Sequence, residues 1–191
     1  MNIITRTAAF ADIELRGSDG RTIHGIAVPF DQPTQIQDSI GASYTETFRR
    51  GAFARTLSER GASRVKLLAV HDSRSFPLGR LSSAVEDAAG LRIEARVSAT
   101  QAGDEALELV RDGALDAFSI GFVPVATGDR WDQRRTSVER LEVKLHEVSL
   151  VPFPAYSGAV IAGVRSADQS PYDPDLDPEF LARQFRLAQL L

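Results

Sequence analysis

Apolar and polar residues alternate along several short stretches of the chain. The clearest is residues 91–97, where four apolar residues at odd positions are separated by three charged residues. Side chains of a β-strand point alternately to opposite faces, so this pattern predicts a strand with one buried face. Residues 10–16 show the same alternation, and a second strand over 22–30 follows the Gly-Ser-Asp-Gly turn at 17–20. The two stretches therefore predict a hairpin.

Three further apolar runs predict strands, at residues 65–72, 119–125 and 136–151, the last being one long strand or a bent pair. The polar residues 31–47 predict a long loop, and 127–135 predict a polar turn that carries Trp131.

Two short segments have helical spacing. Residues 51–60 precede Gly61, and residues 104–112 precede Gly113, which is typical of a helix C-terminus. The inward face of the second helix is expected to hold Ala106, Leu107, Leu109 and Val110. Short strands with two short helices predict an α+β fold that is mainly antiparallel sheet, closing into a β-barrel.

The composition changes after Arg165. Residues 166–178 hold three prolines and four aspartates, which predicts a flexible linker. Residues 179–191 return to helix-compatible apolar spacing. We therefore expect a domain over 1–165, a linker over 166–178 and an amphipathic helical tail over 179–191.

Composition narrows the classes of function. The formal net charge of −4 argues against general nucleic-acid binding, and no apolar run is long enough to cross a membrane. The first ten residues lack the apolar core of a signal peptide. The absence of cysteine excludes disulfides, thiolate metal sites and a cysteine nucleophile, and it fits a reducing cytosolic setting.

Common cofactor and metal motifs are absent. The chain has three histidines, none in a His-Glu-x-x-His arrangement, and no glycine-rich phosphate-binding motif. The Gly-x-Ser-x-Gly motif of α/β-hydrolases is missing as well. We therefore expect a function that needs neither a metal nor a cofactor.

Ser119 is the candidate nucleophile. In a strand, Ser119 and Gly121 share one face, while Ile120 and Phe122 point into the core. A hydroxyl beside a bare glycine leaves an open spot that a substrate carbonyl could approach. The alternative is a strand serine whose hydroxyl is bonded locally.

His71 is the best candidate for the general base that a serine nucleophile needs. It ends the apolar row of the strand over 65–72 and precedes a loop. A structural histidine is the alternative.

Four residues could orient the imidazole of His71: Asp72, Asp116, His146 and Glu147. Glu147 shares parity with the apolar Val143 and Leu145, and a carboxylate on an apolar row needs a partner. This favours Glu147 as the third member, and the alternative is a simple ion pair with one of the arginines.

Five stretches, taken in order, resemble the prohead proteases of tailed bacteriophages. They are GIAVPF at 25–30, residues 48–57 with GAF at 51–53, residues 65–80 with HD at 71–72 and PLGR at 77–80, residues 106–122 with GALDAFSIGF at 113–122, and EVSLV at 147–151 followed by PA at 154–155. Together they cover roughly residues 10–165.

The resemblance implies a serine endopeptidase that cleaves scaffold and capsid precursors inside the immature phage head, in the cytoplasm of the bacterial host. It implies a barrel like that of the herpesvirus assembly protease, commonly dimeric. The matching positions imply Ser119, His71 and Glu147 as the triad, whereas the herpesvirus relatives use a second histidine as third member, which would point to His146. The oxyanion donors are left open between Arg80 and backbone amides near Ser119.

Two functions of other classes compete with proteolysis. One is a non-catalytic capsid-assembly or scaffold-binding protein with the same barrel, and the other is a β-barrel ligand-binding module. Neither would depend on Ser119 and His71.

Overall fold

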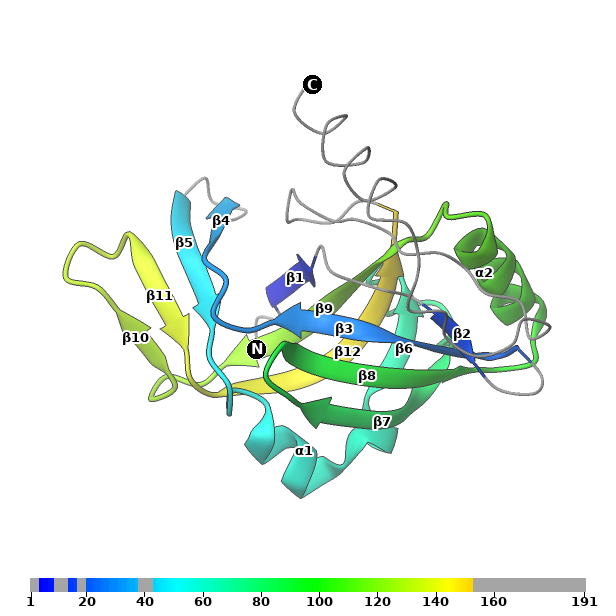
Figure 1. Ribbon diagram of the computed structural model, residues 1–191, viewed down its shortest axis with the longest axis horizontal. Helices are drawn as coiled ribbons and strands as arrows, with labels where there is room; N and C mark the ends of the chain where they lie inside the picture. Colours follow the sequence, from blue (N-terminus) through cyan, green and yellow to red (C-terminus); the bar gives the residue numbers. More distant parts are fainter. Residues whose placement is uncertain (1–3, 9–13, 17–19, 38–42, 153–191) are drawn as a thin grey trace, which may run out of the picture.

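The computed structural model describes residues 4–8, 14–16, 20–37 and 43–152. Strands dominate, with helices α1 and α2 and one short 3-10 turn (Figure 1). The strands are β1 (Ile4–Ala8), β2 (Glu14–Arg16), β3 (Thr22–Pro29), β4 (Thr34–Gln37), β5 (Ser43–Phe48), β6 (Lys66–Ala69), β7 (Gly79–Glu86), β8 (Gly90–Val97), β9 (Ala117–Pro124), β10 (Asp129–Trp131), β11 (Ser137–Arg140) and β12 (Val143–Val151). The helices are α1 (Ala54–Arg60) and α2 (Gln101–Arg111), and the 3-10 turn is Ala62–Arg64.

The larger sheet has eight strands in the order β1-β9-β12-β6-β7-β8-β3-β2 and curls into a half-barrel (Figure 1). Its neighbours run antiparallel except β12 and β6, which are parallel. A smaller sheet, β10-β11-β5-β4, lies at one side. The predicted α+β class with a mainly antiparallel sheet is confirmed.

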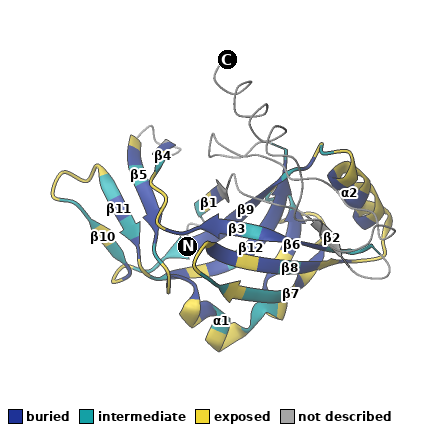
Figure 2. Ribbon diagram, viewed as in Figure 1, coloured by how far each residue is buried: buried dark blue, intermediate teal, exposed yellow. Residues whose placement is uncertain are grey.

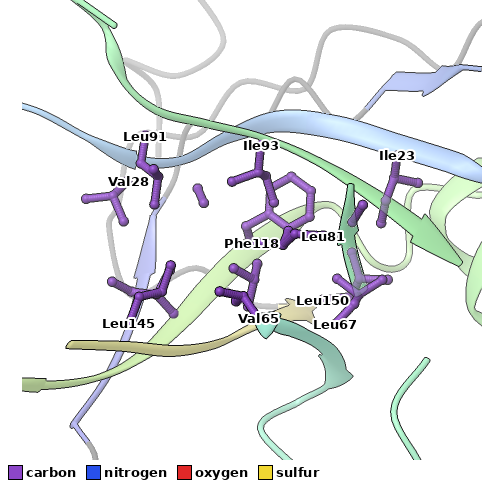
Figure 3. Close-up of a cluster of buried hydrophobic side chains, with 14 of the residues drawn as sticks. Ile23, Val28, Val65, Leu67, Leu81, Leu91, Ile93, Phe118, Leu145 and Leu150 are labelled. Carbon is purple, nitrogen blue, oxygen red and sulfur yellow. The ribbon is translucent and has the colours of Figure 1, made fainter. Parts of the chain in front are cut away.

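The core fills the concave side of the curled sheet. Large apolar side chains from β3, β6, β7, β8, β9 and β12 meet there (Figure 3), and β9 and β12 are buried along most of their length (Figure 2). Phe118, Ile120 and Phe122 of β9 are fully buried in this cluster, as their parity predicts. Each such side chain contributes roughly 1.5–3 kcal/mol of burial free energy. This packing fixes which face of β9 is left for Ser119.

Both helices lie where helical spacing predicts them. Thr100 caps α2 by accepting a hydrogen bond from the amide of Gly103, and Gly113 follows the helix with φ of 73°. One expectation is wrong: Leu109 is 44% exposed and does not belong to the inward face.

Residues 31–47 and the chain after Pro77 differ from the prediction. Residues 31–47 were expected to form a loop, but they contain the paired strands β4 and β5, whose apolar Ile36 and Tyr44 pack against Val138. Pro77 and Leu78 lead directly into β7, a strand that the sequence pattern did not reveal.

Strand β1 was not predicted either, and β10 lies within the expected polar turn over 127–135. The other elements agree with the prediction in outline. The hairpin of β2 and β3 is confirmed where it is described, and residues 136–151 form the pair β11 and β12. The expected linker over 166–178 and helical tail over 179–191 lie outside the described residues, as do residues 10–13.

Candidate active site

Ser119, His71 and Glu147 form one chain of hydrogen bonds on the convex face of the larger sheet. The Nε2 atom of His71 lies 2.6 Å from Ser119 Oγ, and its Nδ1 atom lies 2.7 Å from Glu147 Oε1. A carboxylate only accepts, so Nδ1 must donate, and the neutral ring then accepts the Ser119 hydroxyl at Nε2. This is the tautomer that a general base requires.

Ser119 itself is fully buried, whereas the side chain of His71 is 24% exposed. The three-residue chain therefore reaches solvent through the imidazole.

Strand pairing between β9 and β12 brings the serine and the carboxylate together. The Cα partner of Ser119 is Ser149, and the partner of Gly121 is Glu147. Side chains of paired residues on one face are neighbours, so Ser119 and Glu147 lie diagonally across the two strands.

A β-bulge in β12 decides which face Glu147 occupies. The register shifts between Leu145 and Glu147, with His146 as the extra residue. Val143 and Leu145 face the core before the bulge, while Val148 and Leu150 face it afterwards. The parity argument from sequence was therefore wrong about the face, because it placed Glu147 on the row of Val143 and Leu145. Bulges often re-aim side chains beside active sites in this way.

Gly121 makes room for the carboxylate. A Cβ atom on this residue would collide with Glu147 Oε1 and would lie 3.0 Å from its Cδ. The bare glycine was predicted to open space for a substrate, but in the structure the side chain of Glu147 takes that space. Sequence alone could not reveal this, because the contact depends on the register of β9 and β12.

The chain reverses direction at the end of β6 to present His71. Val70 and His71 have φ of 43° and 62°, in the left-handed region. A continued strand would have pointed His71 to the face of Leu67, into the core. Left-handed backbone costs on the order of 1–3 kcal/mol per residue, and such strain clusters at functional sites.

Ser149 supports the site from β12. Its hydroxyl donates to Glu147 Oε2 at 2.7 Å and accepts from the backbone amide of His71 at 3.0 Å. Sequence reasoning gave Ser149 no supporting role in the site. The alternation of side chains along β12 was the one signal for it.

Within the described residues, no hydrogen bond joins the other candidates to the imidazole of His71, which is bonded to Ser119 and Glu147. Asp72 accepts from the amide of Arg74 and the hydroxyl of Ser75, and the Ser75 bond lowers the pKa of Asp72. Asp116 has one carboxylate oxygen buried with no hydrogen-bond partner among the described residues.

His146 lies at the bulge and faces basic neighbours. Burial lowers its pKa, and Arg60 and Lys144 add to that effect. A positive charge on His146 is therefore disfavoured, and the structure gives it no hydrogen bond to His71 within the described ranges.

Arg80 is remote from the serine. It lies exposed on β7, and β12 and β6 separate that strand from β9. Three strand spacings amount to about 14 Å. Strand order therefore disfavours Arg80 as an oxyanion donor.

The described part of the chain has neither a metal-ligand cluster nor a membrane-spanning helix. No group of three or more His, Asp or Glu side chains there is arranged to hold a metal ion. No helix of the described segments is long and apolar enough to cross a membrane.

Comparison with known proteins gives three similarities. The sequence profile of the caudovirus prohead serine proteases matches residues 10–173. The prohead protease of Enterobacteria phage HK97 is 26% identical over 167 residues, which cover 86% of this chain and 71% of that protein. The solved structure of the bacteriophage T4 capsid assembly protease superposes with a TM-score of 0.49 at 11% identity, covering 78% of this chain and 98% of that one.

Proposed function

The chain belongs to the caudovirus prohead serine protease family, and from that premise we propose that Ser119, His71 and Glu147 are its catalytic triad. The family makes it a serine protease of phage head maturation. The observation that supports the triad is the continuous chain of hydrogen bonds, with 2.6 Å at the serine and 2.7 Å at the carboxylate.

In this mechanism Ser119 Oγ attacks the carbonyl carbon of the scissile peptide bond while His71 Nε2 takes the hydroxyl proton. Glu147 accepts a hydrogen bond from Nδ1–H and stabilises the imidazolium that forms, without taking up the proton. The proton then passes from Nε2 to the leaving amine as the C–N bond breaks, which leaves an ester on Ser119.

Water completes the cycle by the same route. His71 removes a proton from the water that attacks the ester carbonyl, and it returns that proton to Ser119 Oγ as the acid product leaves. His71 must be neutral at the start of both half-reactions, acylation and deacylation, because it acts as the base in each. Backbone amides near Ser119 are our candidates for the oxyanion donors.

The substrates are scaffold and capsid proteins of the phage head, and the place of action is the phage head in the host cytoplasm. The forms of these proteins that the protease cuts would be the precursors that are present before maturation. Membership of a protease family does not favour the rival functions, a non-catalytic assembly protein or a ligand-binding barrel.

The direct test is incubation of the purified chain with the scaffold and capsid precursors of its own phage. Mass spectrometry should detect defined fragments with the wild type and none with Ser119→Ala or His71→Ala. Loss of the serine or the histidine of a triad costs on the order of 10⁶-fold in kcat. Full cleavage by a folded Ser119→Ala variant would contradict the assignment.

We also expect a homodimer or a higher oligomer, as the resemblance to the herpesvirus assembly protease implies. Sedimentation of the purified chain should detect a species of at least twice the chain mass of 20.8 kDa. A monomer at every concentration up to the millimolar range would refute this.

A further inference from the structure

Ser149 holds two members of the triad at once. It lies on β12, is fully buried, and is the Cα partner of Ser119 on β9. Its hydroxyl is 2.7 Å from Glu147 Oε2 and 3.0 Å from the backbone nitrogen of His71. Among the described side chains, Ser149 alone is hydrogen-bonded both to the carboxylate of Glu147 and to the backbone of His71.

The direction of both hydrogen bonds follows from the donors available. A hydroxyl carries one proton, and a backbone amide can only donate. Ser149 must therefore accept from His71, which leaves its own proton for the carboxylate of Glu147. The same assignment argues against Ser149 as the nucleophile, because the imidazole of His71 bonds to Ser119.

The left-handed turn at His71 makes this acceptor important. Three consecutive amides hold the turn: Val70 donates to Leu150 O at 2.9 Å, His71 to Ser149 Oγ at 3.0 Å and Asp72 to Ala69 O at 2.8 Å. Only the middle acceptor is a side chain. A substitution at Ser149 therefore removes the acceptor for the His71 amide but keeps the hydrogen bonds of the Val70 and Asp72 amides.

Glu147 depends on the same hydroxyl. Its Oε1 accepts from the imidazole, and its Oε2 accepts from Ser149. Two bonds on separate oxygens fix the plane of the carboxylate, whereas one bond leaves it free to rotate.

We propose that Ser149 is a positioning residue of the protease, which locks the carboxylate of Glu147 and the main chain of His71 in register with Ser119. This inference rests on the proposed triad. A misplacement of about 1 Å in such a site can cost on the order of 10²-fold in rate.

The test compares Ser149→Ala with a matched control, Thr56→Val. Thr56 is a buried hydroxyl near the other end of β12, where it donates to Val143 O at 3.0 Å and accepts from the Leu145 amide at 3.3 Å. Both substitutions delete a buried hydroxyl that bridges two groups, but only Ser149 touches the triad.

We expect Ser149→Ala to lower kcat on precursor cleavage by about 10²-fold with KM nearly unchanged. Thr56→Val should lower only the unfolding midpoint. In proton NMR spectra, the downfield resonance of the His71 Nδ1 hydrogen should shift or broaden in Ser149→Ala and persist in Thr56→Val. Ser149→Thr, which restores a hydroxyl, should recover part of the lost kcat.

Separate outcomes overturn the inference and the proposed function. If the wild type cleaves and folded Ser149→Ala cleaves with the same kcat, the inference is wrong and the triad stands. If Ser149→Ala does not fold, Ser149→Cys is measured instead, because a thiol has a similar size but is a weak donor and a weak acceptor. A wild-type kcat in that variant would also contradict the inference. If Ser119→Ala still cleaves while Ser149→Ala does not, Ser149 is the nucleophile and both proposals fail.

Discussion

The third member of the triad is the residue on which the chemistry depends most finely. Glu147 and His146 are neighbours in sequence, and only one of them contacts the imidazole of His71. A carboxylate there stabilises the imidazolium and selects the reactive tautomer, whereas an uncharged amide does neither.

We expect Glu147→Gln to reduce cleavage by about 10⁴-fold, the order of loss known for the equivalent substitution in serine proteases. His146→Gln should cost less than tenfold, because His146 lies at the bulge and its pKa is lowered by burial and by basic neighbours. Steady-state cleavage of a precursor-derived peptide by both variants decides the question. A larger loss in His146→Gln would favour the Ser-His-His arrangement of the herpesvirus relatives.

Sequence patterns named candidate residues that the structure brings together, but they did not predict how those residues are oriented. Ser119 faces away from the core as its alternation with Ile120 and Phe122 predicted. Strand parity placed His71 and Glu147 on apolar rows, and both placements were wrong. A left-handed pair of residues and a bulge each reset the alternation, and neither leaves a mark that periodicity can detect.

At the scale of elements, the site is a property of the pair β9 and β12. Their register sets Glu147 opposite Gly121 and Ser149 opposite Ser119. The bulge at His146 then turns the side chains of Glu147 and Ser149 to the convex face, while apolar residues of β12 stay in the core. Packing keeps this arrangement, because Leu145 and Val148 on either side of the bulge are both fully buried.

Gly121→Ala tests this pairing. The added Cβ would collide with the end of the Glu147 side chain, so the carboxylate must move away from His71. We expect cleavage to fall by roughly 10²-fold while the unfolding midpoint changes little, because the group that has to move is a flexible side chain. Unchanged cleavage in this variant would show that the carboxylate position is not critical.

Strands β4 and β5, which the sequence did not predict, are buried by contacts with strands that are distant in the sequence. β4 and β5 carry few apolar residues and owe their burial to Val138 and Trp131 from distant β11 and β10. Strand propensity is decided by such neighbours more than by the segment itself.

At the scale of the whole molecule, buried charges tie the two sheets together. Glu46 of β5 accepts from Arg6 of β1 at 2.6 Å and from Arg140 of β11 at 2.8 Å, and Arg140 also pairs with Asp129. Burial alone would lower the pKa of Arg140, but Glu46 and Asp129 outweigh it and raise the pKa. The cluster holds β1, which pairs with the serine-bearing β9.

Glu46→Gln should lower the free energy of unfolding by roughly 3 kcal/mol or more, because it leaves two buried arginines short of a counter-charge. Asp31→Asn is the matched control: Asp31 accepts from Arg49 at 2.6 Å, but its side chain is 59% exposed. Exposed pairs contribute about 0–1 kcal/mol. Urea unfolding of both variants gives the comparison, and equal losses would refute a special role for the buried cluster.

The segment after residue 165 bears on self-processing. Its prolines and aspartates predict extended chain that a protease could accept. We expect intact-mass measurement after long incubation to show loss of a C-terminal fragment from the wild type and none from Ser119→Ala. An identical full-length mass for both chains would rule out trimming.

We propose that Ser119 is the nucleophile and that His71 activates it. The most direct measurement is covalent labelling with a small fluorophosphonate in a preparation that cleaves its precursor, followed by peptide mapping. We expect a single adduct on Ser119 that is lost in Ser119→Ala and strongly reduced in His71→Ala. An adduct on another serine, or active protein with Ser119 unlabelled, would contradict the account.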